Sequence, residues 1–253
     1  MFISSSSNEK IKQYKKLKDS KYRTQFKQFI IEGYHMVEEA KKISNLIIEI
    51  FEASENPVYY ESIKTTNAII KELANTITPQ KIVAICDQNV FWDYQAKINL
   101  KTKNNFSLAL DSLQDPGNIG TIIRLANAFN IKELIINNVD IFNDKILRSS
   151  QGAIFKTKIT LVNNLYEFLE TKKQNNYLIY TTELNKNAIE LNTFKFNKKE
   201  NSIIVMGNEG NGISKKISSL ANKKLYIKIF FESLNVACAT AIVLNHAINN
   251  ESE

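Results

Sequence analysis

Residues 205–212 read VMGNEGNG and overlap the end of the mainly apolar run SIIVMG at 202–207. They hold three of the seven glycines of the chain, at positions 207, 210 and 212. A glycine cluster directly after a predicted strand indicates that the backbone approaches a ligand closely. The spacing GxxGxG is the reverse of the dinucleotide fingerprint GxGxxG, and the chain contains no GxxxxGK[ST] phosphate loop. A nicotinamide-dependent oxidoreductase and a P-loop enzyme are therefore disfavoured, and a ligand-free glycine turn stays open for this loop alone.

The segments around this loop alternate between strand and helix patterns. Strands are predicted at 106–113, 133–139, 177–183, 202–207 and 224–230, and helices at 118–129 and 235–250. Such alternation predicts a mostly parallel sheet covered on both faces. Two further polar loops follow predicted strands, DSLQDPGNIGTIIR at 111–124, with Asn118 beginning its helix, and FFESLNVACA at 230–239. Ligands bind at the carboxyl ends of the strands in open α/β sheets, so three loops are candidates for one site.

The first hundred residues predict a smaller α/β domain. Helices are expected at 8–27, 35–43 and 67–75, and strands at 28–33, 45–53, 58–62 and 81–86. The segment around 97–105 is polar and charged without apolar periodicity. We therefore predict a first domain at 1–98, a linker at 99–105 and a second domain at 106–253.

Basic residues concentrate near the start of the chain. The formal net charge is +7, and eight basic residues between Lys10 and Lys27 face a single acid, Asp19. Tyr14, Tyr22 and Phe26 are interleaved with them, a composition that suits phosphates and unstacked bases. An alternative is a solvated amphipathic helix that buries Ile11, Tyr14 and Leu17. The residues predicted to contact RNA are Lys12, Lys15, Lys16, Lys21 and Arg23.

Other classes of protein find little support in the sequence. The apolar run 236–244 is too short to span a bilayer, and no secretory signal pattern opens the chain, so a cytoplasmic protein without membrane contact is expected. Cys86 and Cys238 are expected to be buried free thiols, since neither sits in a CxxC or Cys/His cluster. His35 and His246 have no partners at metal-ligand spacing, and both are interpreted as surface histidines. No metal is expected.

Taken together, NIGTIIRLANAF (118–129), VMGNEGNGIS (205–214) and ESLNVACATAIVL (232–244) resemble the three motifs of the SpoU/TrmH family of RNA 2′-O-ribose methyltransferases, of the SPOUT superfamily. The segment LRSSQGAIF (147–155) is similar to the family segment after the second catalytic strand, and 8–40 with 76–85 resembles the RNA substrate-binding domain that often precedes it. The resemblance implies a deep trefoil knot in the second domain, a first domain of ribosomal-protein-like fold, S-adenosylmethionine as cofactor, and a homodimer. The reaction implied is methyl transfer to a ribose 2′-hydroxyl of structured RNA, which needs no metal.

The resemblance also implies roles for individual residues. Arg124 is the residue most often assigned to the 2′-hydroxyl, either to remove its proton or to hold the neighbouring phosphate and stabilise the developing alkoxide. Because a guanidinium stays protonated and only donates, the second role is equally economical. The remaining catalytic candidates are Asn118, Glu209, Ser233 and Asn235, with both asparagines also placed as helix N-caps, and Gly207, Ile227 and Leu234 match cofactor-binding positions.

One segment departs from the family pattern. The third motif usually contains IPM and a glycine before SLN, whereas residues 227–232 read IKIFFE. This puts cofactor affinity and the register of that motif in question. Ribosomal RNA is the expected substrate, and the alternatives are transfer RNA or a catalytically inactive knotted RNA-binding protein that assists ribosome assembly.

Overall fold

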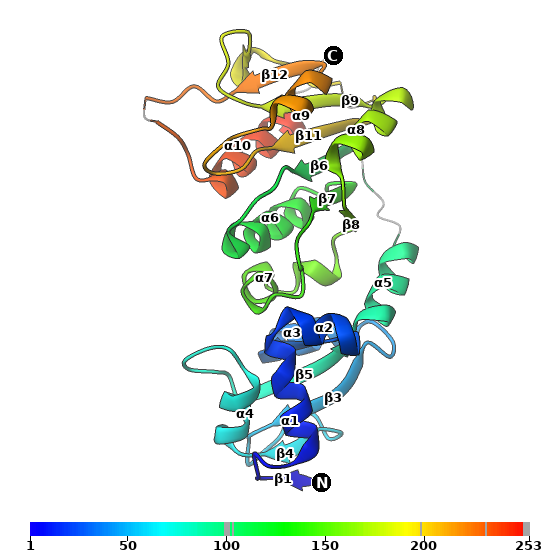
Figure 1. The fold of residues 1–253 in the computed structure, drawn as a ribbon, viewed down its shortest axis with the longest axis vertical. Coiled ribbons are helices and arrows are strands. Elements are labelled where there is room, and N and C mark those ends of the chain that lie inside the picture. Colours follow the sequence, from blue (N-terminus) through cyan, green and yellow to red (C-terminus); the bar gives the residue numbers. More distant parts are fainter. Residues whose placement is uncertain (99–101, 103, 198, 231, 250–253) are drawn as a thin grey trace. The chain divides into compact units, whose positions relative to one another are not determined.

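A computed structural model of the chain describes residues 1–98, 102, 104–197, 199–230 and 232–249. The chain forms two compact units. The first comprises Met1–Ile98 together with Asp140–Phe155, and the second comprises Asn99–Val139 and Lys156–Glu253. Each unit has its own sheet (Figure 1). Most of the predicted linker, at 99–101 and 103, lies outside the described residues.

The N-terminal unit is built on a five-stranded mixed sheet in the order β1-β4-β3-β5-β2. The β1-β4 and β4-β3 pairs are parallel, whereas β3-β5 and β5-β2 are antiparallel. The strands are β1 (Phe2–Ile3), β2 (Gln28–Glu32), β3 (Ile47–Glu52), β4 (Ile63–Thr65) and β5 (Ile82–Asp87). The helices are α1 (Glu9–Lys15), η1 (Lys16–Lys18), α2 (Ser20–Phe26), α3 (Tyr34–Lys41), α4 (Asn67–Leu73), α5 (Gln88–Lys97), α7 (Asp144–Ser150) and η2 (Ala153–Phe155).

The single helix predicted at 8–27 is divided in the structure. Asp19 has extended backbone, and its carboxylate accepts from the backbone N–H of Lys21, so it caps α2 and interrupts the first helix. Helix α2 ends at Phe26, and the next residue, its C-cap Lys27, adopts a left-handed conformation at φ 54°. The amphipathic interpretation is confirmed, because Ile11 and Tyr14 of α1 and Leu17 of η1 are buried.

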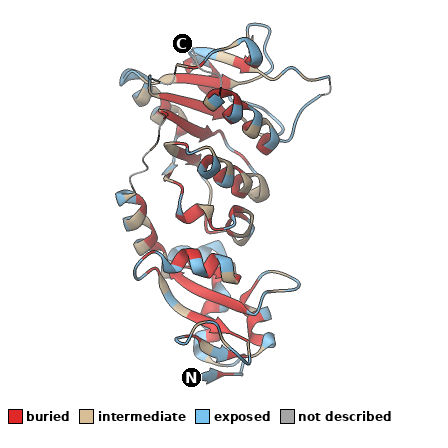
Figure 2. Ribbon diagram, turned by 180° about the vertical axis from the view of Figure 1, so that it is seen from behind, coloured by how far each residue is buried: buried red, intermediate tan, exposed pale blue. Residues whose placement is uncertain are grey.

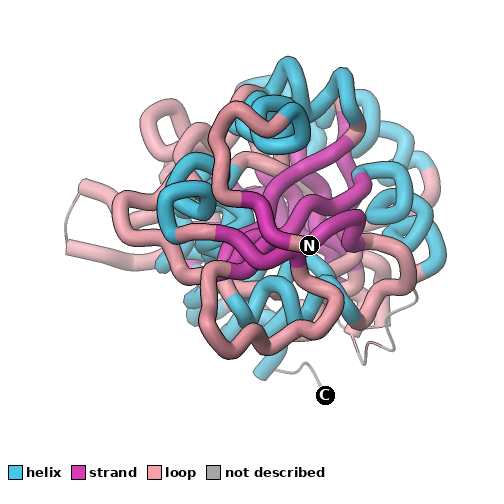
Figure 3. Tube along the Cα trace, turned by 90° about the horizontal axis from the view of Figure 1, so that it is seen from below, coloured by secondary structure: helices cyan, strands magenta, loops and turns pink. Residues whose placement is uncertain are grey.

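Helices α1 and α4 pack on one face of this sheet, where their apolar residues meet Phe51, Val83 and Ile85. Helices α3 and α7 pack against β2. Figure 3 views the chain from below, with strands close to the marked N-terminus.

The strand predicted at 58–62 is wrong. Glu52, fully buried at the end of β3, accepts hydrogen bonds from the backbone N–H of Val58 and Tyr59 and from the hydroxyl of Ser62. These bonds fold residues 53–62 into a loop around the carboxylate, because backbone donors that could have joined a strand ladder are used locally.

The C-terminal unit is built on a seven-stranded sheet whose strand pairs are all parallel, in the order β10-β12-β9-β11-β6-β7-β8. The strands are β6 (Phe106–Leu110), β7 (Glu133–Asn137), β8 (Ile159–Val162), β9 (Leu178–Thr182), β10 (Ile189–Glu190), β11 (Ser202–Met206) and β12 (Lys223–Tyr226). The helices are α6 (Pro116–Ala128), α8 (Leu165–Gln174), η3 (Leu191–Thr193), α9 (Lys215–Leu220) and α10 (Val236–Asn249).

The sheet is covered on both faces, as the continuous apolar runs of its strands require. Helices α8 and α9 bury Leu165, Leu169, Ile217 and Leu220 against Ala109, Ile203 and Val205 of the sheet, while α6 packs against α10. Strands β6 and β11 are buried along their whole length (Figure 2). The predicted α/β fold class with a parallel C-terminal sheet and a smaller N-terminal α/β domain is confirmed. The trefoil knot stays a prediction.

Three details of the sequence interpretation need correction. The last strand stops at Tyr226, so 227–229 belong to the following loop and not to the strand predicted at 224–230. His246 is buried with its Nε2 at 2.7 Å from the carbonyl oxygen of Phe194, and Cys238 is exposed.

In the described part of the chain, no helix combines the length and apolarity that crossing a membrane requires.

Candidate active site

The loops after β9, β11 and β12 and the start of α10 enclose a cavity of about 430 Å³ in the C-terminal unit. All three residues predicted to bind a cofactor, Gly207, Ile227 and Leu234, line it. Apolar side chains of Ile213, Leu225, Ile227, Ile229, Leu234 and Val236 supply much of the wall. The volume lies in the range of sites for small organic ligands, and apolar walls with a few polar groups are typical of them.

The glycine loop is held in shape by Asn208. Its side-chain Oδ1 accepts from the backbone N–H groups of Gly210 and Asn211, at 2.8 and 3.2 Å, and its Nδ2 donates to the carbonyl oxygen of Ser112 at 2.7 Å. The loop after β11 is thereby tied to the loop after β6. Asn208 was not selected from the sequence, although an asparagine two residues before a glycine is a signal for such an Asx turn.

Asp111 forms a hydrogen bond just beyond the end of the same loop. It is 4% exposed at the end of β6, and its Oδ2 accepts from the backbone N–H of Ser214 at 2.8 Å. Asp111 was also missed, because a carboxylate that acts on a distant backbone N–H leaves no local pattern in the sequence.

Gly207 occupies a position with no room for a side chain. A Cβ atom there would lie 2.5 Å from the carbonyl carbon of Gly212 and 2.7 Å from the backbone nitrogen of Ile213. Both ends of the loop meet at this point, since Asn208 and Gly212 exchange two backbone hydrogen bonds of 3.0 Å. The closed loop therefore depends on glycine at 207.

Three of the predicted catalytic residues form one hydrogen-bonded chain. Asn118 Nδ2 donates to Glu209 Oε1, and Asn235 Nδ2 donates to Asn118 Oδ1, both at 2.9 Å. The chain connects α6, the glycine loop and the start of α10, three elements far apart in sequence. Glu209 and Asn235 are exposed. Asn118 uses its oxygen and its nitrogen at once, so its amide orientation is fixed by both neighbours.

The two asparagines differ in their second function. Asn235 Oδ1 accepts from the backbone N–H groups of Ala237 and Cys238, so it caps α10 as predicted. The cap of α6 is instead Asp115, whose Oδ2 accepts from the backbone N–H of Asn118. The expectation that Asn118 begins its helix is wrong, and its side chain is left for Glu209 and Asn235.

Ser233 and Arg124 lie apart from this chain of bonds. Ser233 lines the cavity and is exposed. Arg124 lies on α6, exposed, and among the described residues its side chain has no hydrogen bond or ion pair. Among the described residues, Glu209 and Arg124 form no hydrogen bond or ion pair with each other. Arg124 thus presents all five of its donors to solvent or to a ligand.

The predicted RNA-contacting residues in the N-terminal unit divide into two groups. Lys12, Lys15, Lys16 and Phe26 line one surface groove, while Lys16 and Lys21 approach the ring of Tyr22 at 5.7 and 5.8 Å. The rings of Tyr22 and Phe26 stack at 5.9 Å. Arg23 differs from the lysines: it is 5% exposed, and its guanidinium donates to Asp140 and to two backbone carbonyls. With its donors used internally, Arg23 is not available to RNA.

Replacing Asn118 with aspartate tests the hydrogen-bonded chain. The new carboxylate would face Glu209 and lose the donor that joins them, so we expect the activity of the site to fall about 10- to 100-fold, as measured by kcat/KM. Asn127→Asp, on an exposed position of the same helix, is the matched control and should change kcat/KM by less than about twofold. Equal activity of the two variants would contradict a role for the chain.

A glycine loop closed over an apolar cavity, beside an amide and carboxylate chain at the ends of parallel strands, is typical of a binding site for a small organic ligand. Comparison with known protein families identifies the family of this chain. Residues 105–245 match the SpoU rRNA Methylase family, and residues 8–84 match the MRM3-like substrate binding domain. The chain belongs to the SpoU rRNA methylase family and carries an MRM3-like substrate-binding domain at its N-terminal side.

Individual relatives agree with this assignment. The chain is 32% identical over 254 aligned residues to the 23S rRNA (guanosine(2553)-2′-O)-methyltransferase RlmP of Bacillus subtilis, covering 96% of this chain and 98% of that protein. A solved structure of a putative RNA methyltransferase of the TrmH family from Porphyromonas gingivalis matches with a TM-score of 0.79 at 28% identity, over 95% and 97% of the two chains. The AdoMet-bound rRNA methyltransferase of Sinorhizobium meliloti has the same fold, with a TM-score of 0.82 at 24% identity over 97% and 96%.

Proposed function

We propose that this protein transfers a methyl group from S-adenosylmethionine to a ribose 2′-hydroxyl of ribosomal RNA. The observation that carries the proposal is the position of the Glu209–Asn118–Asn235 chain: Glu209 lines the 430 Å³ cavity, and the two amides continue from it. A donor in the cavity and an acceptor held by these polar groups would be neighbours. The near full-length similarity to a ribosomal RNA ribose methyltransferase supports the substrate class.

The residues of the cavity fit S-adenosylmethionine. Ile227, Ile229 and Leu234 offer apolar surface for an adenine, and the backbone around Gly207 offers polar groups at close approach. When bound, this cofactor supplies a methyl group on a sulfonium. The departure from the family pattern at 227–232 leaves Ile227 and Ile229 in the wall of the cavity, which supports cofactor binding.

The acceptor hydroxyl must be aligned with the donor. During transfer its oxygen forms the bond to the methyl carbon, the methyl–sulfur bond would break to leave a neutral thioether, and the hydroxyl proton is released to solvent. Asn118 and Asn235 are held in fixed orientation by their mutual hydrogen bond, and Ser233 stands at the same cavity, so these groups can orient the ribose. Glu209 accepts from Asn118 and is exposed, which suits a carboxylate that accepts a hydrogen bond from the ribose. Arg124 grips the adjacent phosphate and stabilises the developing alkoxide.

The proposal includes a cytoplasmic location and a homodimer. The homodimer is the state that the resemblance to the family implies. Sedimentation equilibrium would show a dimer, whereas a monomer at micromolar concentration would contradict this part.

RNA would be held by the lysines of α1, η1 and α2. Replacing both Lys16 and Lys21 with alanine is expected to weaken RNA binding about tenfold and to reduce the slope of log affinity against log salt by about 1 to 2. The matched control removes two exposed lysines from the C-terminal unit, Lys195 and Lys216, and should leave the slope nearly unchanged. The measurement is a salt series of filter-binding titrations, and equal slopes for both double variants would argue against this surface.

Mapping ribose methylation in RNA from cells with and without this protein tests the proposed function. A 2′-O-methyl group blocks alkaline cleavage of the neighbouring phosphodiester, so loss of one protected position identifies the target. The similarity to RlmP makes a guanosine of 23S ribosomal RNA the first position to inspect. A lost position in transfer RNA would transfer the activity to that substrate. No difference in either RNA, combined with failure to bind S-adenosylmethionine, would favour a ribosome-assembly factor without activity.

A further inference from the structure

Residues 140–155 lie within the C-terminal unit in sequence but within the N-terminal unit in the structure. In sequence they connect β7 to β8, neighbouring strands of the C-terminal sheet, and they lie inside the segment that matches the methylase family. In the structure they are part of the N-terminal unit. The chain therefore passes between the units three times, after Ile98, after Val139 and after Phe155.

Aromatic side chains hold this segment in the N-terminal unit. Phe142 stacks on Phe29 of β2 with ring centroids 4.4 Å apart, and it meets the edge of Phe91 of α5 at 5.2 Å. Phe155, at the other end of the segment, contacts Phe91 at 6.3 Å. Phe29, Phe91, Phe142 and Phe155 are all at most 5% exposed. The contact is thus a core, with the packing expected within one folded unit.

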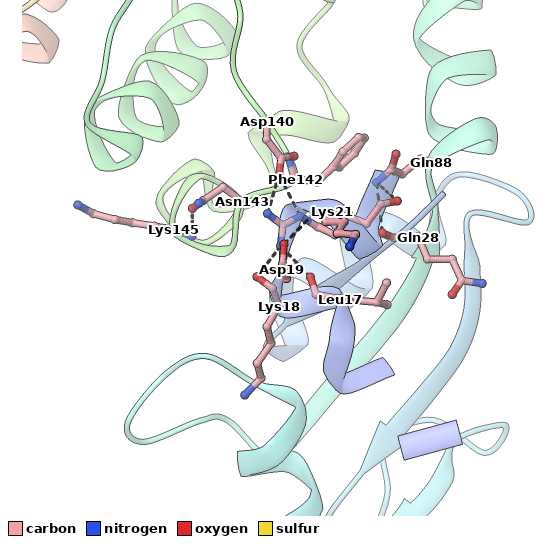
Figure 4. Close-up of polar contacts among 11 residues, drawn as sticks. Leu17, Lys18, Asp19, Lys21, Gln28, Gln88, Asp140, Phe142, Asn143 and Lys145 are labelled. Atoms are coloured by element: carbon pink, nitrogen blue, oxygen red, sulfur yellow. Dashed lines mark hydrogen bonds and ion pairs between the residues drawn. The ribbon is translucent and has the colours of Figure 1, made fainter. Parts of the chain in front are cut away.

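An ion pair between buried Arg23 and partly exposed Asp140 joins the segment to the basic helices. Arg23 of α2 donates from Nε and Nη2 to Asp140 Oδ2, at 3.0 and 2.6 Å, and from Nη1 to the carbonyl oxygens of Leu17 and Lys18, at 2.7 and 2.8 Å. Figure 4 shows Asp140 and Phe142 facing Leu17 and Lys18 across these bonds. One guanidinium therefore links η1, α2 and the start of the segment.

The end of the segment fits closely too. Gly152 has φ +80°, and a Cβ there would lie 2.9 Å from Glu39 Cγ of α3. Beside it, His35 Nε2 lies 3.2 Å from the carbonyl oxygen of Gln151. Contacts at both ends of the segment leave it little freedom to separate from the N-terminal unit.

Arg23 belongs to the same short stretch of chain as two lysines proposed to contact RNA. Lys21 is in the same short helix, and Lys16 begins η1, whose carbonyl oxygens Arg23 holds. The helices that would carry the RNA are thus bonded to a segment whose two ends continue directly into β7 and β8.

From these contacts we propose that segment 140–155 couples RNA held by the N-terminal unit to the methyl-transfer site, with Arg23 and Asp140 as positioning residues. The inference rests on the proposed function. RNA bound on the lysines would still bind if the coupling were loosened, but its ribose would be presented less often in the orientation that transfer needs. The coupling is therefore expected to act on the rate of transfer from bound RNA and not on RNA affinity.

The test compares Arg23→Gln and the milder Asp140→Asn with wild-type full-length protein. Asp140→Asn leaves the bonds from Arg23 to Leu17 and Lys18 possible, so it serves where Arg23→Gln does not fold. The matched control is Arg148→Gln, which breaks the ion pair with Asp144 inside α7 and touches no bond between the segment and α2. Four quantities are measured on each protein: hydrogen exchange of 140–155, affinity for S-adenosylmethionine, affinity for a ribosomal RNA fragment, and kcat at saturating RNA.

We expect both test variants to exchange 140–155 about tenfold faster and to lose about tenfold in kcat, while both affinities stay within about twofold of wild type. The control should retain kcat. Faster exchange with unchanged kcat would overturn the coupling, as would a loss of RNA affinity equal to the loss in kcat, which indicates a structural role only. If wild type itself transfers no methyl group, the proposed function fails, and unchanged exchange in the variants would separately refute the docking by Arg23 and Asp140.

Discussion

Arg124→Ala is expected to lower the rate of methyl transfer at least about 100-fold while leaving affinity for S-adenosylmethionine within about twofold of wild type. The reason is position. Arg124 is exposed on α6 with no partner among the described residues, and it does not line the 430 Å³ cavity. Its removal therefore takes a charge from the acceptor side of the reaction and leaves the donor side intact.

Single-turnover transfer of a labelled methyl group to ribosomal RNA measures this effect, with calorimetry for the cofactor. Arg124→Lys is the informative companion variant, because lysine keeps the charge but loses the planar fork. A phosphate-holding role predicts that lysine recovers part of the lost rate. Methylation at the wild-type rate in Arg124→Ala would remove Arg124 from the site altogether.

Gly207→Ala is expected to weaken S-adenosylmethionine binding about 10- to 100-fold, because the added methyl group would force the loop open. The new Cβ would meet backbone atoms of Gly212 and Ile213 at 2.5 and 2.7 Å, and backbone cannot rotate away as a flexible side chain can. The loop would have to break its paired bonds between Asn208 and Gly212. Since this loop lines the cavity, the loss should appear in cofactor affinity first.

Gly210→Ala is the matched control in the same loop. There the nearest atom to an added Cβ is Asn208 Oδ1 at 3.5 Å, an ordinary contact, so binding should change by less than about threefold. Isothermal titration of all three proteins with the cofactor measures the difference. Similar affinities for the two variants would show that the closed shape of the loop is not what binds the cofactor.

The C-terminal unit could be predicted well from sequence because its signals are local. Alternating strand and helix patterns place loops at the carboxyl ends of parallel strands, and topology then brings them together. The structure joins Asn118, Glu209 and Asn235 over separations of 91 and 117 residues by two hydrogen bonds. These three residues could be identified from the sequence because they match family motifs. The hydrogen bonds between them could not be predicted, because no local pattern indicates them.

Two of the wrong predictions have the same cause: the residue forms hydrogen bonds with a residue that is not its neighbour in sequence. The strand expected at 58–62 is a loop because the buried carboxylate of Glu52 takes its backbone donors. Arg23, chosen as an RNA contact from a one-sided charge run, is buried against Asp140, 117 residues away. Lys18, in the same charge run but not among the predicted RNA contacts, is half-buried and donates from Nζ to the carbonyl oxygen of Ala74. Burial lowers its pKa, and Lys15 adds to the effect. Composition counts charges, but only the fold decides which of them face solvent.

The membership of 140–155 in the N-terminal unit limits how this protein can be divided. A chain cut at Ile98 would yield an N-terminal fragment whose Phe29 and Phe91 lose the packing of Phe142 and Phe155. The complementary fragment would expose Phe142 and Phe155 in the connection between β7 and β8. Both halves would carry newly bared apolar surface and an unpaired member of the Arg23–Asp140 pair. Separate family models match the two parts of the sequence. Even so, cutting the chain at one position is not expected to yield either unit as a stably folded protein.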